Sequence, residues 1–174
     1  MQLSFSSITL PTWITLSRLI AVPVILAIFS WQDESTARII ASIAFLIAAL
    51  TDWLDGYLAR KLNQVTELGK FLDPLVDKLL IIAPLIVLVQ LRQIPAWGVF
   101  LIVARELLIT AWRGSPDQPK VVGANLLGKI KTVAQIVSIA LLLLQLPGAL
   151  LLFWVAVGLT LVSGIVYVIP VRNV

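Results

Sequence analysis

The chain has 174 residues, of which 60% are hydrophobic and 13% are charged, and its mean hydropathy is +1.03. Soluble domains average about 25% charged residues, and a fold of this size leaves much of its surface in contact with solvent. The composition therefore argues against a soluble monomer, and its high hydrophobicity excludes a disordered chain. It predicts an integral membrane protein.

The residue types that are missing limit the chemistry. The chain contains no cysteine and no histidine, which excludes disulfides, thiolate or imidazole metal ligands and a Ser-His-Asp triad. Any metal must therefore bind oxygen, which favours magnesium, manganese or calcium. The net charge of +4 is typical of membrane topology and anionic headgroups, so no nucleic-acid partner is expected.

Six apolar stretches follow one another along the chain, each near the roughly 20 residues that a helix needs to cross a bilayer. They cover residues 10–31, 37–61, 69–91, 94–113, 121–146 and 148–169. Polar or turn residues separate them, for example Asp33-Glu34-Ser35 after the first stretch and Pro147-Gly148 after the fifth. No linker or convincing repeat divides the sequence. We therefore expect an all-α integral membrane protein with six transmembrane helices in a single domain, residues 1–174.

Basic residues predict the orientation of these spans. An even number of spans puts both termini on the same side as the connections near 62–68 and 114–120. That side carries Arg60, Lys61, Lys70, Arg113, Lys120 and Arg172. The connections on the other side hold only two arginines against two acidic residues. The positive-inside rule then places both termini in the cytoplasm.

Charged residues also lie inside the predicted spans, each within about ten residues of a cytoplasmic end, or about 15 Å along a helix. They are Arg18, Asp52, Asp55, Asp73, Asp77, Lys78, Arg105, Glu106, Lys129 and Lys131. Long side chains can reach the interface from this depth, but the short side chain of aspartate cannot. Charges so placed usually face a polar cavity and mark a functional site. We expect a charged cavity in the cytoplasmic half of the bundle, open to the cytoplasm.

Two pairs of aspartates form the centre of the expected site. Asp52 and Asp55 are three residues apart and Asp73 and Asp77 are four apart, so each pair shares one face of its helix. Four carboxylates brought together would repel one another strongly unless cations neutralised them. Two divalent cations would suit four carboxylates, and a two-metal site can stabilise the attacking and leaving oxygens of a phosphoryl-type transfer.

Small residues accompany the aspartates. Gly56, Ala59 and Gly69 leave the helix surfaces beside the carboxylates without large side chains. Such surfaces let a ligand approach the backbone, although small residues also let membrane helices pack closely. The four aspartates and Arg60, which lie in register with these small residues, favour the ligand interpretation.

The pattern D-x2-D-G-x2-A-R-x8-G-x3-D-x3-D is matched at every position from Asp52 to Asp77. It resembles the signature of the CDP-alcohol phosphotransferases, integral membrane enzymes that make phospholipids. The resemblance implies that Asp52, Asp55, Asp73 and Asp77 bind two magnesium or manganese ions, and that Asp77 is also the general base for the acceptor hydroxyl. It further implies that the site for the CDP group is lined by Gly56, Ala59, Arg60, Thr66 and Gly69.

Four further cations bear on the acceptor. Arg105 and Arg113 lie eight residues apart, near one helix face, and Lys129 and Lys131 follow in the fifth span. A phosphorylated alcohol would supply an anion for them, since arginine binds phosphate in a bidentate manner. The alternatives are an internal salt bridge with Glu106 or contact with lipid headgroups.

The stretches TDWLDGYLARKLNQVTELGKFLDPLVDKLL, ARELLITAWR and ANLLGKIKTVAQ resemble one branch of that family, the bacterial phosphatidylglycerophosphate synthases. This resemblance implies CDP-diacylglycerol and sn-glycerol 3-phosphate as substrates, contact with membrane lipids, a homodimer, and a multi-pass location in the bacterial inner membrane. The runner-up is a cardiolipin synthase, whose acceptor is phosphatidylglycerol. Inositol phosphate or serine is a weaker choice of acceptor. A divalent-cation channel is disfavoured, because it needs a continuous polar path and the outer halves of the spans hold almost no charge. A transporter is disfavoured as well, because the sequence shows no paired inverted repeats or broken helices.

Overall fold

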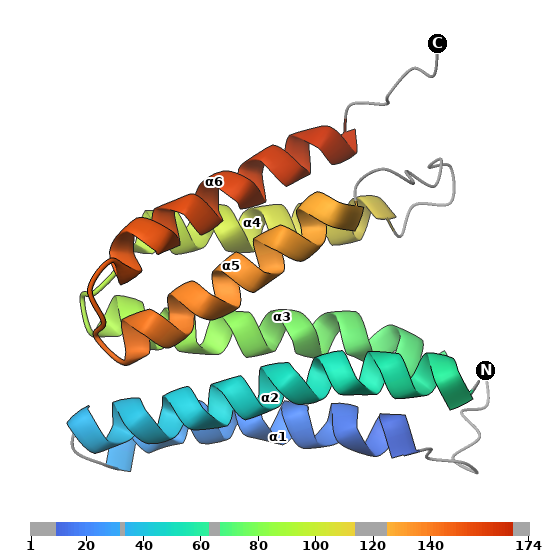
Figure 1. Cartoon of the computed structure of the whole chain (residues 1–174), viewed down its shortest axis with the longest axis horizontal. Helices are drawn as coiled ribbons and strands as arrows, with labels where there is room; N and C mark the ends of the chain where they lie inside the picture. Colours follow the sequence, from blue (N-terminus) through green and yellow to red (C-terminus); the bar gives the residue numbers. More distant parts are fainter. Residues whose placement is uncertain (1–9, 32–33, 63–66, 114–124, 169–174) are drawn as a thin grey trace. The chain divides into compact units, whose positions relative to one another are not determined.

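The computed structural model describes the backbone of residues 10–31, 34–62, 67–113 and 125–168, and the side chains of residues 16–29, 35–51, 72–112 and 126–166. Within these residues every regular element is an α-helix (Figure 1). The helices are α1 (Leu10–Trp31), α2 (Glu34–Leu62), α3 (Glu67–Gln90), α4 (Ala96–Arg113), α5 (Asn125–Leu143) and α6 (Ala149–Val168). The all-α prediction is confirmed, with one helix in each predicted stretch.

The helix bounds agree with the sequence to within a few residues. The first helix has the predicted bounds, whereas α2 begins at Glu34 rather than at residue 37. The fifth was expected over residues 121–146, but α5 ends at Leu143, and residues 121–124 lie outside the described part of the chain. The early end coincides with the left-handed backbone of Gln145, which has a φ of 54° and cannot continue the helix.

Two connections between helices are closed by the same backbone motif. At the end of α3, Arg92 has a φ of 55°, and the amide of Gln93 donates to the carbonyl of Leu88 at 3.0 Å. At the end of α5, Gln145 has a φ of 54°, and the amide of Leu146 donates to the carbonyl of Leu141 at 2.9 Å. Both are Schellman caps, which satisfy the last carbonyls of a helix and turn the chain sharply.

The chain divides into two compact units, residues Met1–Pro84 and Leu85–Val174. In the first unit α1 packs against α2, and Phe45 of α2 is completely buried. Alanines at 37 and 41 of α2 are also completely buried. Their small side chains let neighbouring helices approach closely, as is common in membrane bundles. The expectation of a single domain stays a prediction.

In the second unit α6 packs against both α5 and α4 (Figure 1). Phe153 of α6 is completely buried beneath α4. A Cβ atom on Gly98 would lie 2.9 Å from the Phe153 ring, so the glycine is what allows α4 to come this close. Trp97 and Trp154 complete the contact, with ring centroids 4.5 Å apart. The C-terminal helix is thereby held between two partners.

Apolar side chains cover much of the outer surface of the described helices. Leu108 and Leu151, for example, are 69% and 72% exposed. Two segments, 126–143 in α5 and 149–166 in α6, are long and apolar enough to cross a membrane, and 16–29 and 35–51 are shorter apolar helical segments.

Candidate functional site

The acidic motif occupies the end of α2 and the start of α3. Asp52, Asp55, Gly56, Ala59 and Arg60 all belong to α2. Gly69, Asp73 and Asp77 belong to α3. Each aspartate pair therefore lies within one helix, as the shared-face argument requires. Thr66 falls outside the described residues, as do the side chains of the motif residues from Asp52 to Gly69.

The two aspartates of α3 have described side chains, and one of them forms an ion pair across the first unit. Nη1 of Arg18 on α1 donates to Oδ1 of Asp77 at 2.9 Å. The Arg18 side chain is only 3% exposed, whereas that of Asp77 is 45% exposed. A buried guanidinium thus holds a carboxylate that remains accessible from outside the pair. Arg18 received no specific role from the sequence, because its partner is 59 positions away.

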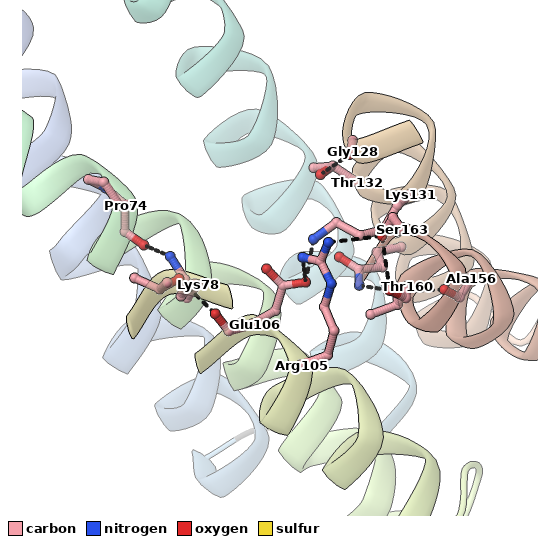
Figure 2. A network of polar contacts seen from close by, with 12 residues as sticks. Pro74, Lys78, Arg105, Glu106, Gly128, Lys131, Thr132, Ala156, Thr160 and Ser163 are labelled. Atoms are coloured by element: carbon pink, nitrogen blue, oxygen red, sulfur yellow. Dashed lines mark hydrogen bonds and ion pairs between the residues drawn. The ribbon is translucent and has the colours of Figure 1, made fainter. Parts of the chain in front are cut away.

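The donor atoms of the motif are suited to a hard divalent cation. Among the side chains that the structure describes, no three acidic residues form a group able to hold a metal, and the side chains of Asp52 and Asp55 are not among those described. Asp73 and Asp77 contribute carboxylate oxygens one helical turn apart, and both are partly exposed. The carboxylate oxygens of Asp73 and Asp77 are donors of the kind that magnesium or manganese prefers. Nearby, Lys78 donates to the backbone carbonyl of Pro74 at 2.6 Å (Figure 2).

A cluster richer in cations is built in the second unit. Nη1 of Arg105 on α4 donates to Oε1 of Glu106 at 3.2 Å, and Nζ of Lys131 on α5 donates to the same oxygen. Figure 2 shows the three side chains converging from the two helices. Arg105 is 9% exposed and Lys131 is 6% exposed. The cluster formed by Arg105, Glu106 and Lys131 therefore contains two cations and one carboxylate, with a formal charge of one positive unit.

The four cations proposed for the acceptor phosphate are thus not equivalent. Arg105 and Lys131 come together at Glu106, so the internal salt bridge that the sequence left open is present. Lys129 is exposed, because two positions along α5 turn its side chain to another side of the helix. The Arg113 side chain lies outside the described residues, although its backbone ends α4.

A row of buried polar residues continues from this cluster between α5 and α6. Nη2 of Arg105 donates to Oγ of Ser163 at 2.9 Å, and Nε2 of Gln135 donates to Oγ1 of Thr160 at 2.9 Å. Ser163, Thr160 and Gln135 are all at most 3% exposed. These residues were not predicted from the sequence, since isolated Ser, Thr and Gln within apolar helices give no motif. The signal that was available is their spacing. Thr160 and Ser163 are three residues apart on one face of α6, and Gln135 follows Lys131 by four residues on one face of α5.

Comparison with known proteins identifies the family. A model of the CDP-alcohol phosphatidyltransferase family matches residues 8–162. A Bacillus subtilis protein named CDP-diacylglycerol--glycerol-3-phosphate 3-phosphatidyltransferase is 49% identical, over 89% of this chain and 91% of its own length. A relative from Arabidopsis thaliana, named CDP-diacylglycerol--glycerol-3-phosphate 3-phosphatidyltransferase 2, is 39% identical over 95% of this chain and 81% of its own length. A Rickettsia bellii protein with the same name as the Bacillus subtilis one is 35% identical over 91% of this chain and 92% of its own length. The chain belongs to the CDP-alcohol phosphatidyltransferase family.

Proposed function

We propose that this chain transfers the phosphatidyl group of CDP-diacylglycerol to sn-glycerol 3-phosphate, giving phosphatidylglycerophosphate and CMP. The observation that carries the proposal is the 49% identity, over nearly the full length, to a relative named for this reaction. The complete acidic motif from Asp52 to Asp77 adds support from the residues. The enzyme is therefore a transferase of phospholipid biosynthesis.

The aspartates carry the proposed chemistry. Asp52, Asp55, Asp73 and Asp77 would hold two magnesium or manganese ions, which when bound neutralise the charge of the diphosphate and of the departing CMP. The oxygen-only donor set supports this assignment. The CDP group would lie along Gly56, Ala59, Arg60, Thr66 and Gly69.

Asp77 is assigned as the general base. The hydroxyl oxygen of the acceptor forms a bond to the lipid-side phosphorus, the bond from that phosphorus to CMP breaks, and the hydroxyl proton passes to the Asp77 carboxylate. The ion pair with Arg18 supports this role, because it orients a carboxylate that is still 45% exposed. Arg18 is then a positioning residue for the base.

The acceptor phosphate is assigned to the cations of the second unit. Arg105 and Lys131 are buried beside Glu106 in a cluster of two cations and one carboxylate, a suitable setting for a phosphate dianion. Lys129 and Arg113 are proposed as outer contacts of the same phosphate. The salt bridge and the phosphate contact are compatible, because Glu106 supplies one negative charge against two positive ones.

We further propose six transmembrane helices, both termini in the cytoplasm, and a site in the cytoplasmic half of the bacterial inner membrane. The apolar outer surfaces and the basic connections support this topology. One domain covering residues 1–174, contact with membrane lipids and a homodimer complete the proposal, in keeping with the family.

The test is CMP release by purified protein supplied with CDP-diacylglycerol and magnesium. Parallel reactions contain sn-glycerol 3-phosphate, phosphatidylglycerol, inositol 1-phosphate or no acceptor. Release that requires glycerol 3-phosphate is the expected result. Release with phosphatidylglycerol alone would make the protein a cardiolipin synthase, and no release by folded protein would reopen a role in cation transport. Chelation of divalent ions should stop the reaction, and added magnesium or manganese should restore it.

A further inference from the structure

We propose that Ser163 and Gly164 of α6 position Arg105 and thereby set the affinity for the phosphate of the acceptor. The inference rests on the proposed function, in which Arg105 binds that phosphate. Both residues are uncharged, and both lie just beyond residues 8–162, the part of the chain that the family model matches. They would be positioning residues, which act on the substrate through the arginine.

Ser163 fixes one side of the guanidinium. Its Oγ accepts from Nη2 of Arg105 at 2.9 Å and itself donates to the carbonyl of Thr160 at 2.9 Å (Figure 2). The hydroxyl hydrogen is thus held by the backbone of α6, which turns the lone pairs of the oxygen toward the arginine. Ser163 is only 1% exposed, so water does not compete readily for this contact. A buried hydrogen bond to a charged group is stronger than one between neutral groups.

Gly164 makes room for the rest of the side chain. A Cβ atom at this position would lie 3.1 Å from Cγ and 3.2 Å from Nε of Arg105. The arginine therefore crosses directly over the glycine, and a Cβ atom there would require the Arg105 side chain to shift by a few tenths of an ångström. Nε of Arg105 is buried and has no hydrogen-bond partner among the described residues. An unsatisfied buried donor is unfavourable, so the position of the guanidinium is imposed by its other contacts.

The neutral character of these two residues has a consequence for charge. Glu106 already contributes one carboxylate, which Arg105 shares with Lys131. A second carboxylate in place of Ser163 would offset the positive charge of the cluster. A hydroxyl instead orients the guanidinium without neutralising it, which preserves the attraction for a phosphate dianion. The geometry therefore points to α6, which carries no charged residue, as a determinant of acceptor binding.

The test compares Ser163→Ala and Gly164→Ala with Ser163→Thr, which retains the hydroxyl, and with Gly158→Ala. Gly158 is a matched control, because it lies on the same helix and a Cβ atom there would meet nothing within 4 Å. For Ser163→Ala we expect the KM for glycerol 3-phosphate to rise about tenfold. For Gly164→Ala we expect a smaller rise of about threefold. In Ser163→Ala and Gly164→Ala the kcat and the KM for CDP-diacylglycerol should stay within about twofold of wild type. Gly158→Ala should keep all three constants within that range, and Ser163→Thr should have a lower acceptor KM than Ser163→Ala because it retains the hydroxyl.

A second measurement asks whether Ser163 acts through Arg105. In an Arg105→Lys background, Ser163→Ala should add no further increase in the KM for glycerol 3-phosphate, because the contact is already lost. A further increase of about tenfold in that background would overturn the inference, as would an unchanged acceptor KM in folded Ser163→Ala and Gly164→Ala proteins. If one of these overturning results is obtained and wild-type protein uses glycerol 3-phosphate, the inference fails while the proposed function stands. If wild type does not use it, both fail.

Discussion

The two compact units of this chain hold charge in opposite ways. In residues Met1–Pro84 the described carboxylates of α3 are partly open, and a buried arginine, Arg18, holds Asp77. In residues Leu85–Val174 the cations Arg105 and Lys131 are buried, and they share one carboxylate. Open carboxylates suit ligands that exchange, such as metal ions, whereas buried cations are already oriented for an anion. The difference predicts that substitutions at Asp77 and Arg18 in the first unit lower kcat, whereas substitutions in the cation cluster of the second unit raise the KM for glycerol 3-phosphate.

The largest effect is expected for Asp77→Asn. An amide cannot take the proton of the acceptor hydroxyl, so turnover should fall by about 10²–10⁴-fold or more. CMP release under saturating substrates measures this loss, and the melting temperature checks that the protein is folded. Lys78→Gln is a neighbouring control that should retain activity, because the described contact of Lys78 is with a backbone carbonyl of its own helix. Turnover of the Asp77→Asn variant near that of wild type would remove Asp77 as the base.

The next largest effect is expected for Arg18→Gln. Loss of the ion pair leaves the Asp77 carboxylate without this orienting contact, and removal of such a partner typically costs about 10–100-fold in activity. The kcat should fall, while the KM for glycerol 3-phosphate stays close to that of wild type. Arg18→Lys retains the charge and should recover part of the loss. A change confined to the acceptor KM would contradict the assignment of Arg18 to the base.

The second unit should respond through substrate affinity. We expect Lys131→Ala to raise the KM for glycerol 3-phosphate about tenfold and to leave kcat nearly unchanged. Lys129→Ala, two positions away on the exposed side of α5, should raise it less, because an exposed contact is screened by solvent. Initial rates over a range of acceptor concentrations distinguish the two variants. A loss of kcat alone in the Lys131→Ala variant would contradict a binding role.

The smallest effect is expected in the polar row between α5 and α6. Thr160→Val removes the acceptor for Gln135, and hydrogen bonds between membrane helices contribute about 1 kcal/mol. The protein should melt a few degrees lower, with both KM values unchanged. Thermal unfolding in detergent, followed beside the kinetic assay, measures this. An altered acceptor KM would extend the binding site further along α6 than we propose.

These differences also explain what the sequence could reveal. The four aspartates from Asp52 to Asp77 stand close together in the chain, with spacings set by the helix period, so a linear pattern exposes them. The apolar stretches likewise predict six helices, since each is long enough to be recognised alone. The bounds were less accurate where a cap rather than composition ends a helix, as at Gln145.

Contacts between distant helices could not be read in this way. Arg18 and Asp77 are 59 residues apart, and Arg105 and Ser163 are 58 apart. Which partners meet depends on helix packing, and Gly98 and Gly164 permit it through the side chains that they lack. Sequence alone suggested Glu106 as a partner for the cations, but not that both would meet at a single oxygen.

The cap at Gln145 bears on how the protein enters its membrane. The chain reverses over residues 144–148 between α5 and α6, and no charged residue occurs between Lys131 and Arg172. The last carbonyls of α5 are already satisfied within this turn, so few polar groups must be carried across the hydrocarbon. In the topology that we propose, helices α5 and α6 would insert together as one hairpin during biogenesis, with basic residues left behind at both ends.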